Sequence, residues 1–131
     1  MAIRVLLVDD EPDMRMLVRL MLERTADIEV VGEAASGEEA VSQTASLVPD
    51  CLLLDYMMPG SFDGIETTRR IRAAEVEREA QPGIVMFTAY STPELRDLAT
   101  DVGVDRVLSK DDFSRVAEAI RDVASASPSS S

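Results

Sequence analysis

Histidine is absent from this 131-residue sequence, and cysteine occurs only once. Without histidine, the protein has no imidazole for acid–base catalysis and none for a histidine-ligated zinc site. The single Cys51 cannot form a disulfide within the chain, which favours a reducing compartment. Because Cys51 begins an apolar run, we interpret it as a small buried side chain rather than a nucleophile.

Basic residues are scarce: 13 lysines and arginines stand against 25 aspartates and glutamates, which gives a net charge of −12. Binding to a phosphate backbone requires lysine and arginine gathered on one face, so this composition argues against direct nucleic-acid contact by the domain. Long apolar runs and a charged-then-apolar N-terminal segment are also missing. The sequence therefore predicts no membrane contact and a cytoplasmic location.

The chain does contain a regular alternation of short apolar runs with stretches of helical periodicity. Its length suits one domain. Short links between strand and helix impose right-handed crossovers, so we predict an α/β fold with a doubly wound, parallel, five-stranded sheet covered on both faces. The predicted strands comprise residues 3–8, 28–33, 51–54, 83–87 and 104–108.

Helix boundaries are marked by proline, glycine and capping side chains. The predicted starting signals are Pro12 for the first helix, Ser36 with Glu39 for the second, Thr92 with Pro93 for the fourth, and Asp111 or Asp112 for the fifth. The second helix is predicted to end near Leu47, the third to span residues 65–79, and the fourth to end at Gly103. Helical spacing predicts inward-facing apolar side chains at Met14, Leu17, Val18 and Met21, and at Leu95, Leu98, Ala99 and Val102.

Carboxylates directly follow two of the predicted strands. Asp9, Asp10 and Glu11 follow the first strand, and Asp55 follows the third. The carboxyl ends of parallel strands meet at one edge of an open sheet, where such folds place their sites. Gathered carboxylates repel one another unless a cation joins them, so this edge is predicted to hold a hard metal ion. Taken alone, the first three acids are better explained by the charge preference of a helix N-terminus.

Two further strand ends carry polar side chains. Thr88 ends the fourth predicted strand, and Lys110 follows the fifth. Each residue alone is typical of a turn or of a solvated surface. Because both lie at the same sheet edge as the acids, their joint placement predicts a site that combines carboxylates with a hydroxyl and an ammonium group.

Four ordered motifs occupy these strand ends. They are Val8-Asp9-Asp10-Glu11, Leu54-Asp55-Tyr56-Met57-Met58-Pro59 followed by Asp63-Gly64, Phe87-Thr88-Ala89, and Ser109-Lys110. The chain thereby resembles the receiver domain of two-component response regulators, a CheY-like fold, over residues 3–124. The resemblance implies a flavodoxin-like (βα)5 sheet with strand order 2-1-3-4-5. It divides the chain into a receiver domain, residues 1–124, and a serine-rich tail or linker start, residues 125–131.

The resemblance also implies a role for each site residue. Asp55 is the expected phosphoacceptor, which takes a phosphoryl group from a histidine kinase or a phosphotransfer protein. A carboxylate suits this role because its oxygen attacks without prior deprotonation and the resulting acyl phosphate remains hydrolysable. Mg²⁺ is the expected cofactor. Its expected protein ligands are Asp9, mainly through water, Asp10, Asp55 and the backbone carbonyl of Met57.

The same resemblance implies a readout of phosphorylation. Thr88, Lys110 and the backbone N–H of Ala89 are expected to contact the phosphoryl group. The face built from residues 92–124 is then expected to change and to control a partner or effector. A homodimer formed on phosphorylation is one expected form of output.

Several positions depart from the family pattern. Val107 stands where many receivers carry an aromatic residue, and Asp111 follows Lys110 where many carry proline. The loop over residues 59–64 is one residue longer than is common. Met57 and Tyr90 are bulky at the positions that control the access of water to the acyl phosphate in this family. They predict slow autodephosphorylation.

Other functions stay open at this point. An Asp-nucleophile, Mg²⁺-dependent phosphatase is disfavoured because Met57 occupies the place of the second aspartate that such enzymes use. A phosphorylation-independent binding module would be expected to lack Asp55, Lys110 or the acid pair, and all are present. A flavodoxin-like cofactor domain would need a glycine-rich phosphate cradle, which the loops lack. We predict a switch that catalyses only its own phosphotransfer and dephosphorylation, either alone or as the N-terminal part of a transcriptional regulator.

Overall fold

The computed structural model describes residues 2–60, 62–74 and 81–125. Within them, five parallel strands form one sheet in the order β2-β1-β3-β4-β5, which confirms the predicted fold class. The strands are β1 (Ile3–Val8), β2 (Ile28–Ala34), β3 (Cys51–Leu54), β4 (Gly83–Thr88) and β5 (Arg106–Ser109). The helices are α1 (Pro12–Glu23), α2 (Gly37–Leu47), α3 (Gly64–Ala74), α4 (Pro93–Val102) and α5 (Val116–Ser125), with a 3₁₀ segment, η1 (Lys110–Arg115), before α5. None of the described helices is long and apolar enough to cross a membrane.

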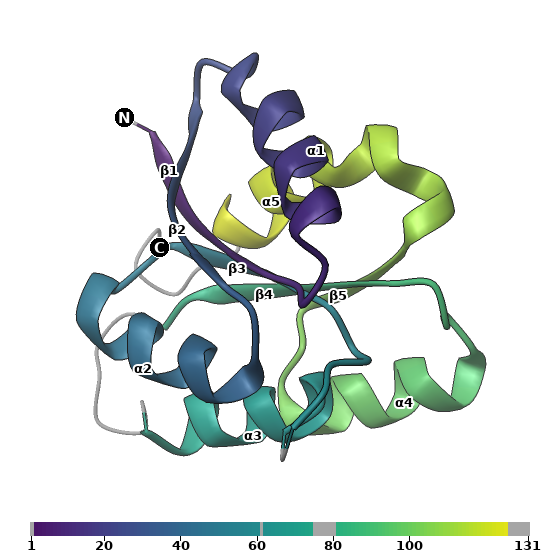
Figure 1. Cartoon of the computed structure of the whole chain (residues 1–131). Helices are drawn as coiled ribbons and strands as arrows, with labels where there is room; N and C mark the ends of the chain where they lie inside the picture. The colour runs from purple at the N-terminus through teal and green to yellow at the C-terminus, as the bar shows by residue number, and fades with distance from the viewer. Residues whose placement is uncertain (1, 61, 75–80, 126–131) are drawn as a thin grey trace.

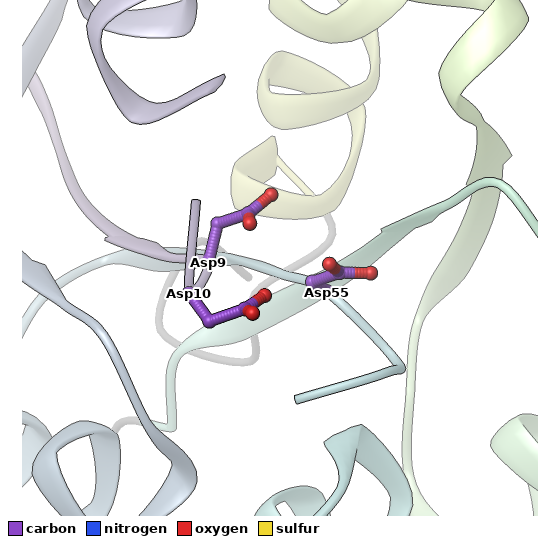
Figure 2. A group of neighbouring side chains, drawn as sticks. All are labelled: Asp9, Asp10 and Asp55. Carbon is purple, nitrogen blue, oxygen red and sulfur yellow. The ribbon is translucent and has the colours of Figure 1, made fainter. Parts of the chain in front are cut away.

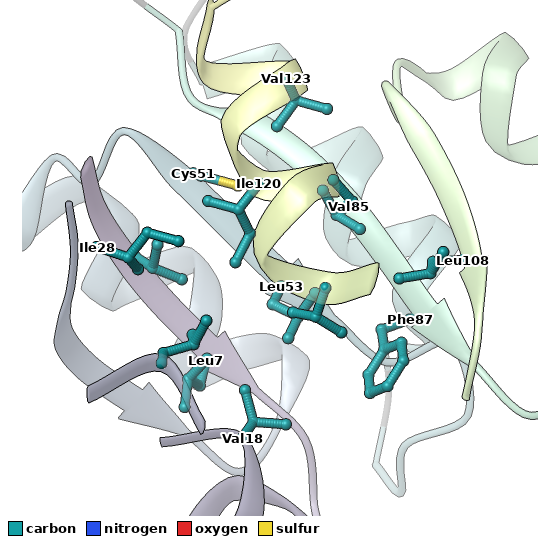
Figure 3. Close-up of a cluster of buried hydrophobic side chains, with 14 residues drawn as sticks. Leu7, Val18, Ile28, Cys51, Leu53, Val85, Phe87, Leu108, Ile120 and Val123 are labelled. Atoms are coloured by element: carbon teal, nitrogen blue, oxygen red, sulfur yellow. The ribbon is translucent and has the colours of Figure 1, made fainter. Parts of the chain in front are cut away.

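Helices cover both faces of the sheet. In Figure 1, α1 and α5 lie on one face, whereas α2, α3 and α4 lie on the other. Successive side chains of a strand point to opposite faces, so Leu7 belongs to the core beneath α1 and α5 while Leu6 belongs to the core on the other side. Figure 3 shows the first core, to which α1 contributes Val18 and α5 contributes Ile120. The strands are therefore buried on both faces, as their continuous apolar runs predict.

The register of the central strands aligns the two acid-bearing strand ends. Val8 of β1 pairs with Leu54 of β3, so Asp9 and Asp55 leave the sheet at the same level. The backbone N–H of Asp55 donates to the carbonyl of Val8 at 2.9 Å. On the other side of β1, the N–H of Asp9 donates to the carbonyl of Ala34 at 3.1 Å. These bonds fix the main chain of both acids at the carboxyl edge.

The predicted helix signals at three helices are confirmed. Pro12 occupies the first turn of α1. Ser36 caps α2, where its hydroxyl accepts a hydrogen bond from the N–H of Glu39 at 3.2 Å. Thr92 caps α4 in the same way, and Gly103 ends that helix with φ at 106°, a conformation that favours glycine. The sequence therefore places these helix ends correctly.

Two predicted inward positions are wrong. Leu17 is 54% exposed and Leu98 is 44% exposed, although both were expected to face the core. The buried stripe of α1 includes Val18 and Leu22, and Leu17 lies about 100° away from Val18 around the helix. In α4 the stripe includes Leu95 and Ala99 at i and i+4, which turns the intervening Leu98 outward.

The start of the fifth helix also differs from the prediction. Neither Asp111 nor Asp112 caps α5; the hydroxyl of Ser109 accepts a hydrogen bond from the N–H of Asp111 at 3.1 Å and caps the 3₁₀ segment η1 instead. Asp112 has non-helical backbone angles, with φ at −100° and ψ at 41°, which interrupt the segment. The chain therefore passes from β5 to α5 through a tight, broken turn. The last part of the predicted third helix, residues 75–79, lies outside the described residues.

Helix α5 packs closely on the start of β4. A Cβ atom added to Gly83 would lie 2.8 Å from Cγ2 of Val123 and 3.2 Å from its carbonyl oxygen. Only glycine leaves room for this contact, since real Cβ atoms do not approach so closely. The helix therefore begins beside the carboxyl edge of the sheet, directly after η1, and ends against the opposite edge.

Candidate functional site

Three carboxylates gather at the carboxyl edge of the sheet. Asp9 and Asp10 follow β1 and Asp55 follows β3, and one oxygen of each lies within 4.8 Å of the others. Figure 2 shows the three side chains next to one another at these strand ends. Asp9 and Asp55 are buried and Asp10 is half-buried. Glu11, which the sequence places beside them, is exposed and lies outside this cluster.

Lys110 joins two of these acids. Its Nζ atom lies 3.1 Å from Oδ2 of Asp9 and 3.2 Å from Oδ2 of Asp55. The ammonium group comes from the first residue of η1, so β5 delivers the cation as the sequence predicted. A single lysine offsets only part of the charge of three clustered carboxylates.

The surroundings of Asp55 favour its neutral form more than water does. Burial and the nearby charge of Asp9 raise the pKa of Asp55 to about 6, although Lys110 acts in the opposite direction. Burial disfavours the charge on Lys110, but Asp55 and Asp9 together outweigh it and raise the pKa of that ammonium group. Lys110 is therefore charged at neutral pH, and Asp55 keeps its charge at an energetic cost.

Local helix capping does not account for the acids. Glu11 occupies the N-cap position of α1, and its side chain makes no capping hydrogen bond. Oδ1 of Asp9 accepts a hydrogen bond from the N–H of Glu11 at 2.9 Å, which orients Asp9 before the helix begins. Within the described residues, the carboxylate of Asp10 has no hydrogen-bond partner. The capping explanation is therefore insufficient for Asp10.

The three carboxylates fit a hard divalent cation. They supply oxygen ligands only, and one half-buried carboxylate keeps its lone pairs available. A divalent ion would also relieve the repulsion that raises the pKa of Asp55. The side chain of Met57 is exposed, in the loop that follows Asp55, and its backbone carbonyl as a ligand stays a prediction.

Thr88 lies at the end of β4 and is fully buried. Its hydroxyl oxygen accepts a hydrogen bond from the N–H of Tyr90 at 3.1 Å. Ala89 and Tyr90 are exposed in the loop that follows. The hydroxyl is thus engaged by its own loop in this structure, next to the acid cluster along the sheet edge.

Sequence reasoning missed Arg15. This residue lies in the first turn of α1, its Nη1 atom donates to the backbone carbonyl of Asp9, and its Nε atom donates to Glu33 Oε1 at 2.8 Å. The available signal was a cation in the first turn of a helix, where acids are normally favoured.

The strand order and the acid–lysine cluster define a class, the flavodoxin-like receiver domains. Residues 5–121 match the response regulator receiver domain family. The chain belongs to that family, which confirms the resemblance. The protein is thus a receiver domain of a two-component system.

Relatives and solved structures agree with this assignment. The chain is 38% identical over 122 residues to the response regulator protein VraR of Staphylococcus epidermidis and 36% identical over 122 residues to VraR of Staphylococcus aureus. Each match covers 92% of this chain and 56% of the relative, so the chain spans about half the length of these relatives.

Two solved structures share both the fold and part of the sequence. A LuxR-family two-component response regulator from Aurantimonas sp. SI85-9A1 has a TM-score of 0.88 at 30% identity, with 96% of this chain and 87% of that chain covered. The signal receiver domain of the putative response regulator NarL from Mycobacterium tuberculosis has a TM-score of 0.85 at 31% identity, with 94% and 96% covered.

Proposed function

We propose that Asp55 accepts a phosphoryl group from a histidine kinase or a phosphotransfer protein. The observation that carries this proposal is the position of Asp55, buried beside Asp9 and held by the ammonium of Lys110. A carboxylate oxygen of Asp55 attacks the phosphorus of a donor phosphohistidine. The new P–O bond forms as the P–N bond breaks, and the donor imidazole leaves. The product is an acyl phosphate, which water later cleaves.

Mg²⁺ is the proposed cofactor, since the oxygen-only cluster suits it. Asp10 and Asp55 would hold the ion directly, Asp9 mainly through water, and the backbone carbonyl of Met57 would complete the protein ligands. When bound, Mg²⁺ offsets the negative charge of the transferring phosphoryl oxygens. Asp9 and Asp10 orient the site, whereas Asp55 alone reacts.

Lys110 and Thr88 are the proposed readers of phosphorylation. The ammonium of Lys110 now lies between Asp9 and Asp55, and it pairs with a phosphoryl oxygen once Asp55 is modified. The hydroxyl of Thr88 exchanges its bond with Tyr90 for one with the phosphoryl group, to which Ala89 donates its backbone N–H. Both contacts exist only in the phosphorylated state, so they shift the domain towards a second conformation.

The face over residues 92–124 is the proposed output surface. It begins at the loop beside Tyr90 and continues through α4, β5, η1 and α5, so movement of Thr88 or Lys110 reaches it directly. A homodimer formed on phosphorylation is one form of that output. Autodephosphorylation is proposed to be slow, and the domain has no further enzymatic activity in this proposal.

The output of the whole protein is proposed to be transcriptional. The curated relatives are about twice as long as this match, and one similar structure is a LuxR-family response regulator. We infer that residues 1–124 form the receiver domain and that residues 125–131 lead to a DNA-binding partner domain. The receiver itself, with a net charge of −12, does not touch nucleic acid in this proposal, and its location is the cytoplasm.

Acetyl phosphate tests the proposal without a cognate kinase. The wild-type protein and Asp55→Asn are incubated with acetyl phosphate and Mg²⁺, and intact mass is measured after acid quench. We expect a gain of one phosphoryl group in the wild type, its loss on treatment with base, and no gain in Asp55→Asn. Asp101→Asn removes an exposed carboxylate from α4 and serves as a matched control that is phosphorylated normally. Equal phosphorylation of wild type and Asp55→Asn would exclude the proposal.

A further inference from the structure

The side chain of Arg15 is largely shielded from solvent. It is only 16% exposed although it lies on the first helix of the domain. With Asp9 and Asp55 it lines a cavity of about 10 Å³ directly beneath the acid cluster. A guanidinium group is seldom placed so deep unless its donors are used.

Two oxygen atoms from different parts of the chain accept hydrogen bonds from this guanidinium group. Nη1 of Arg15 donates to the backbone carbonyl of Asp9, and Nε donates to Oε1 of Glu33 near the end of β2 at 2.8 Å. Arg15 therefore joins the main chain of Asp9 to the neighbouring strand. It makes no hydrogen bond or ion pair with the carboxylate oxygens that form the cluster.

Glu33 is itself held in place. Its second oxygen, Oε2, accepts from Nε of Arg19 at 2.7 Å, and its backbone carbonyl accepts from Nε2 of Gln43 at 2.8 Å. Burial would favour the neutral acid, but the hydrogen bonds from Arg19 and Arg15 outweigh it and lower the pKa of Glu33. Glu33 is therefore a charged and fixed anchor for Arg15 at neutral pH.

Asp9 is thus held from two sides by two cations with different tasks. Lys110 contacts its carboxylate and is the group that the proposed function moves to the phosphoryl oxygen. Arg15 donates to its backbone carbonyl and makes no hydrogen bond or ion pair with Asp55. When Lys110 leaves, Arg15 is the cation that still fixes the segment carrying Asp9 and Asp10.

We propose that Arg15, anchored by Glu33, is a positioning residue that keeps Asp9 and Asp10 in the geometry for binding a divalent cation. The inference rests on the proposed function, since it assigns these acids to the metal. Arg15 acts through the main chain of Asp9 rather than through its charge.

Arg15 could affect cation binding through its charge or through its bond to Asp9. The two explanations predict opposite changes in cation affinity when Arg15 is replaced, which makes the proposal testable. Removing a positive charge next to three carboxylates strengthens cation binding if only charge matters. If position matters, removing the hydrogen bond to the carbonyl of Asp9 weakens cation binding. A residue that orients a metal ligand from outside typically contributes about tenfold in affinity. The sign of the change in affinity therefore separates the two explanations.

The experiment measures Mn²⁺ binding by electron paramagnetic resonance, with Mg²⁺ as competitor, for the wild type and three variants. We expect Arg15→Gln to raise the Kd for Mn²⁺ about tenfold and Arg15→Lys to raise it about threefold, because lysine keeps the charge but not the forked geometry. Arg24→Gln is the matched control. It removes the same charge from an exposed position at the C-terminal end of α1, with no hydrogen bond to Asp9 or Glu33, so its Kd stays within about twofold of wild type.

Amide hydrogen exchange supplies a second readout that does not involve the metal. We expect the amides of Asp10 and Glu11 to exchange faster in Arg15→Gln than in wild type, and at the wild-type rate in Arg24→Gln. Mn²⁺ affinity in Arg15→Gln equal to or tighter than that of wild type, or a wild-type Kd in Arg15→Lys, would overturn the proposal. If Asp55 is not phosphorylated in the wild type, the proposed function fails, and the Mn²⁺ comparison still decides the role of Arg15.

Discussion

The two sides of the site are held by different kinds of contact. On the side of β1 and β3, the main chain itself is fixed: the N–H of Asp55 donates to Val8 and that of Asp9 to Ala34. Arg15 adds a third constraint from below. On this side the carboxylates occupy positions that the sheet determines.

On the side of β4 and β5, the groups belong to loops and to a broken turn. Ala89 and Tyr90 are exposed, and Lys110 begins a 3₁₀ segment that is interrupted at Asp112. Among the described residues of this side, only Lys110 forms ion pairs with the acids. The comparison teaches that the acids are positioned by the fold, whereas the groups that we propose to read the phosphoryl group come from loops and from a broken turn.

The largest expected difference between the two sides is in packing. Leu54 at the end of β3 is fully buried, whereas Val107 on β5 is only partly buried against the same core. Leu54→Ala is expected to lower the free energy of unfolding by about 3 kcal/mol, and Val107→Ala by about 1 kcal/mol. Urea unfolding of both variants measures this. Equal losses would contradict the distinction between a fixed and a movable side.

The fixed side is tightly packed around Gly64, and a substitution at this residue tests that packing. A Cβ atom at Gly64 would lie 2.6 Å from the carbonyl oxygen of Asp55 and 2.8 Å from Cα of Tyr56. Gly64→Ala is therefore expected to cost about 2 kcal/mol of unfolding free energy, because backbone must move, and to slow phosphorylation by acetyl phosphate. Gly60→Ala is the control: with φ at 95° but no atom within 3.4 Å, it is expected to cost about 1 kcal/mol.

The pH dependence of the free energy of unfolding reports how strongly the surroundings of Asp55 disfavour its charged form. Its pKa is raised to about 6 from 3.8, so the folded state binds a proton that the unfolded state has released. Stability is therefore lost as pH rises from about 4 through about 6. In EDTA at pH 7, Asp55→Asn is expected to be about 1.5 kcal/mol more stable than wild type, and to lose that advantage at pH 4. Thermal unfolding of both proteins across this pH range measures the difference in stability. A difference that does not change with pH would show that folding does not raise the pKa of Asp55.

The smallest effect is expected in the two loops that follow Asp55 and Thr88. Met57 is 54% exposed and Tyr90 is 59% exposed, and we propose that both bulky side chains limit the access of water to the acyl phosphate. Met57→Asn and Tyr90→Ala are each expected to shorten the phosphoryl lifetime about threefold, which corresponds to ~0.6 kcal/mol in activation free energy. Leu98→Ala, on the outer face of α4, is the control. An unchanged lifetime in both variants would count against this role.

The fixed side was also the part that sequence alone predicted well. Apolar runs bounded by acids located β1 and β3, and the parallel topology then brought Asp9, Asp10 and Asp55 together. The positions of Thr88 and Lys110 followed from the same rule of strand ends. Periodicity, strand ends and capping signals are local patterns, so they can be recognised in the sequence.

The errors lie where tertiary contacts decide the outcome. Leu17 and Leu98 sit at the borders of their apolar stripes, and only the packing angle of each helix turns them outward. The cap at Ser109 and the break at Asp112 depend on how β5 meets α5. Arg15 was missed because its partners, a carbonyl and a glutamate of another strand, leave no sequence pattern.

The close packing of Val123 on Gly83 has one more consequence. Helix α5 begins directly after the turn that carries Lys110 and ends at the opposite edge of the sheet, about 15 Å away by its ten residues. A helix transmits displacement along its axis as a stiff rod. A shift of the turn at Lys110 along the helix axis would therefore also move the last turn of α5, where Val123 packs on Gly83.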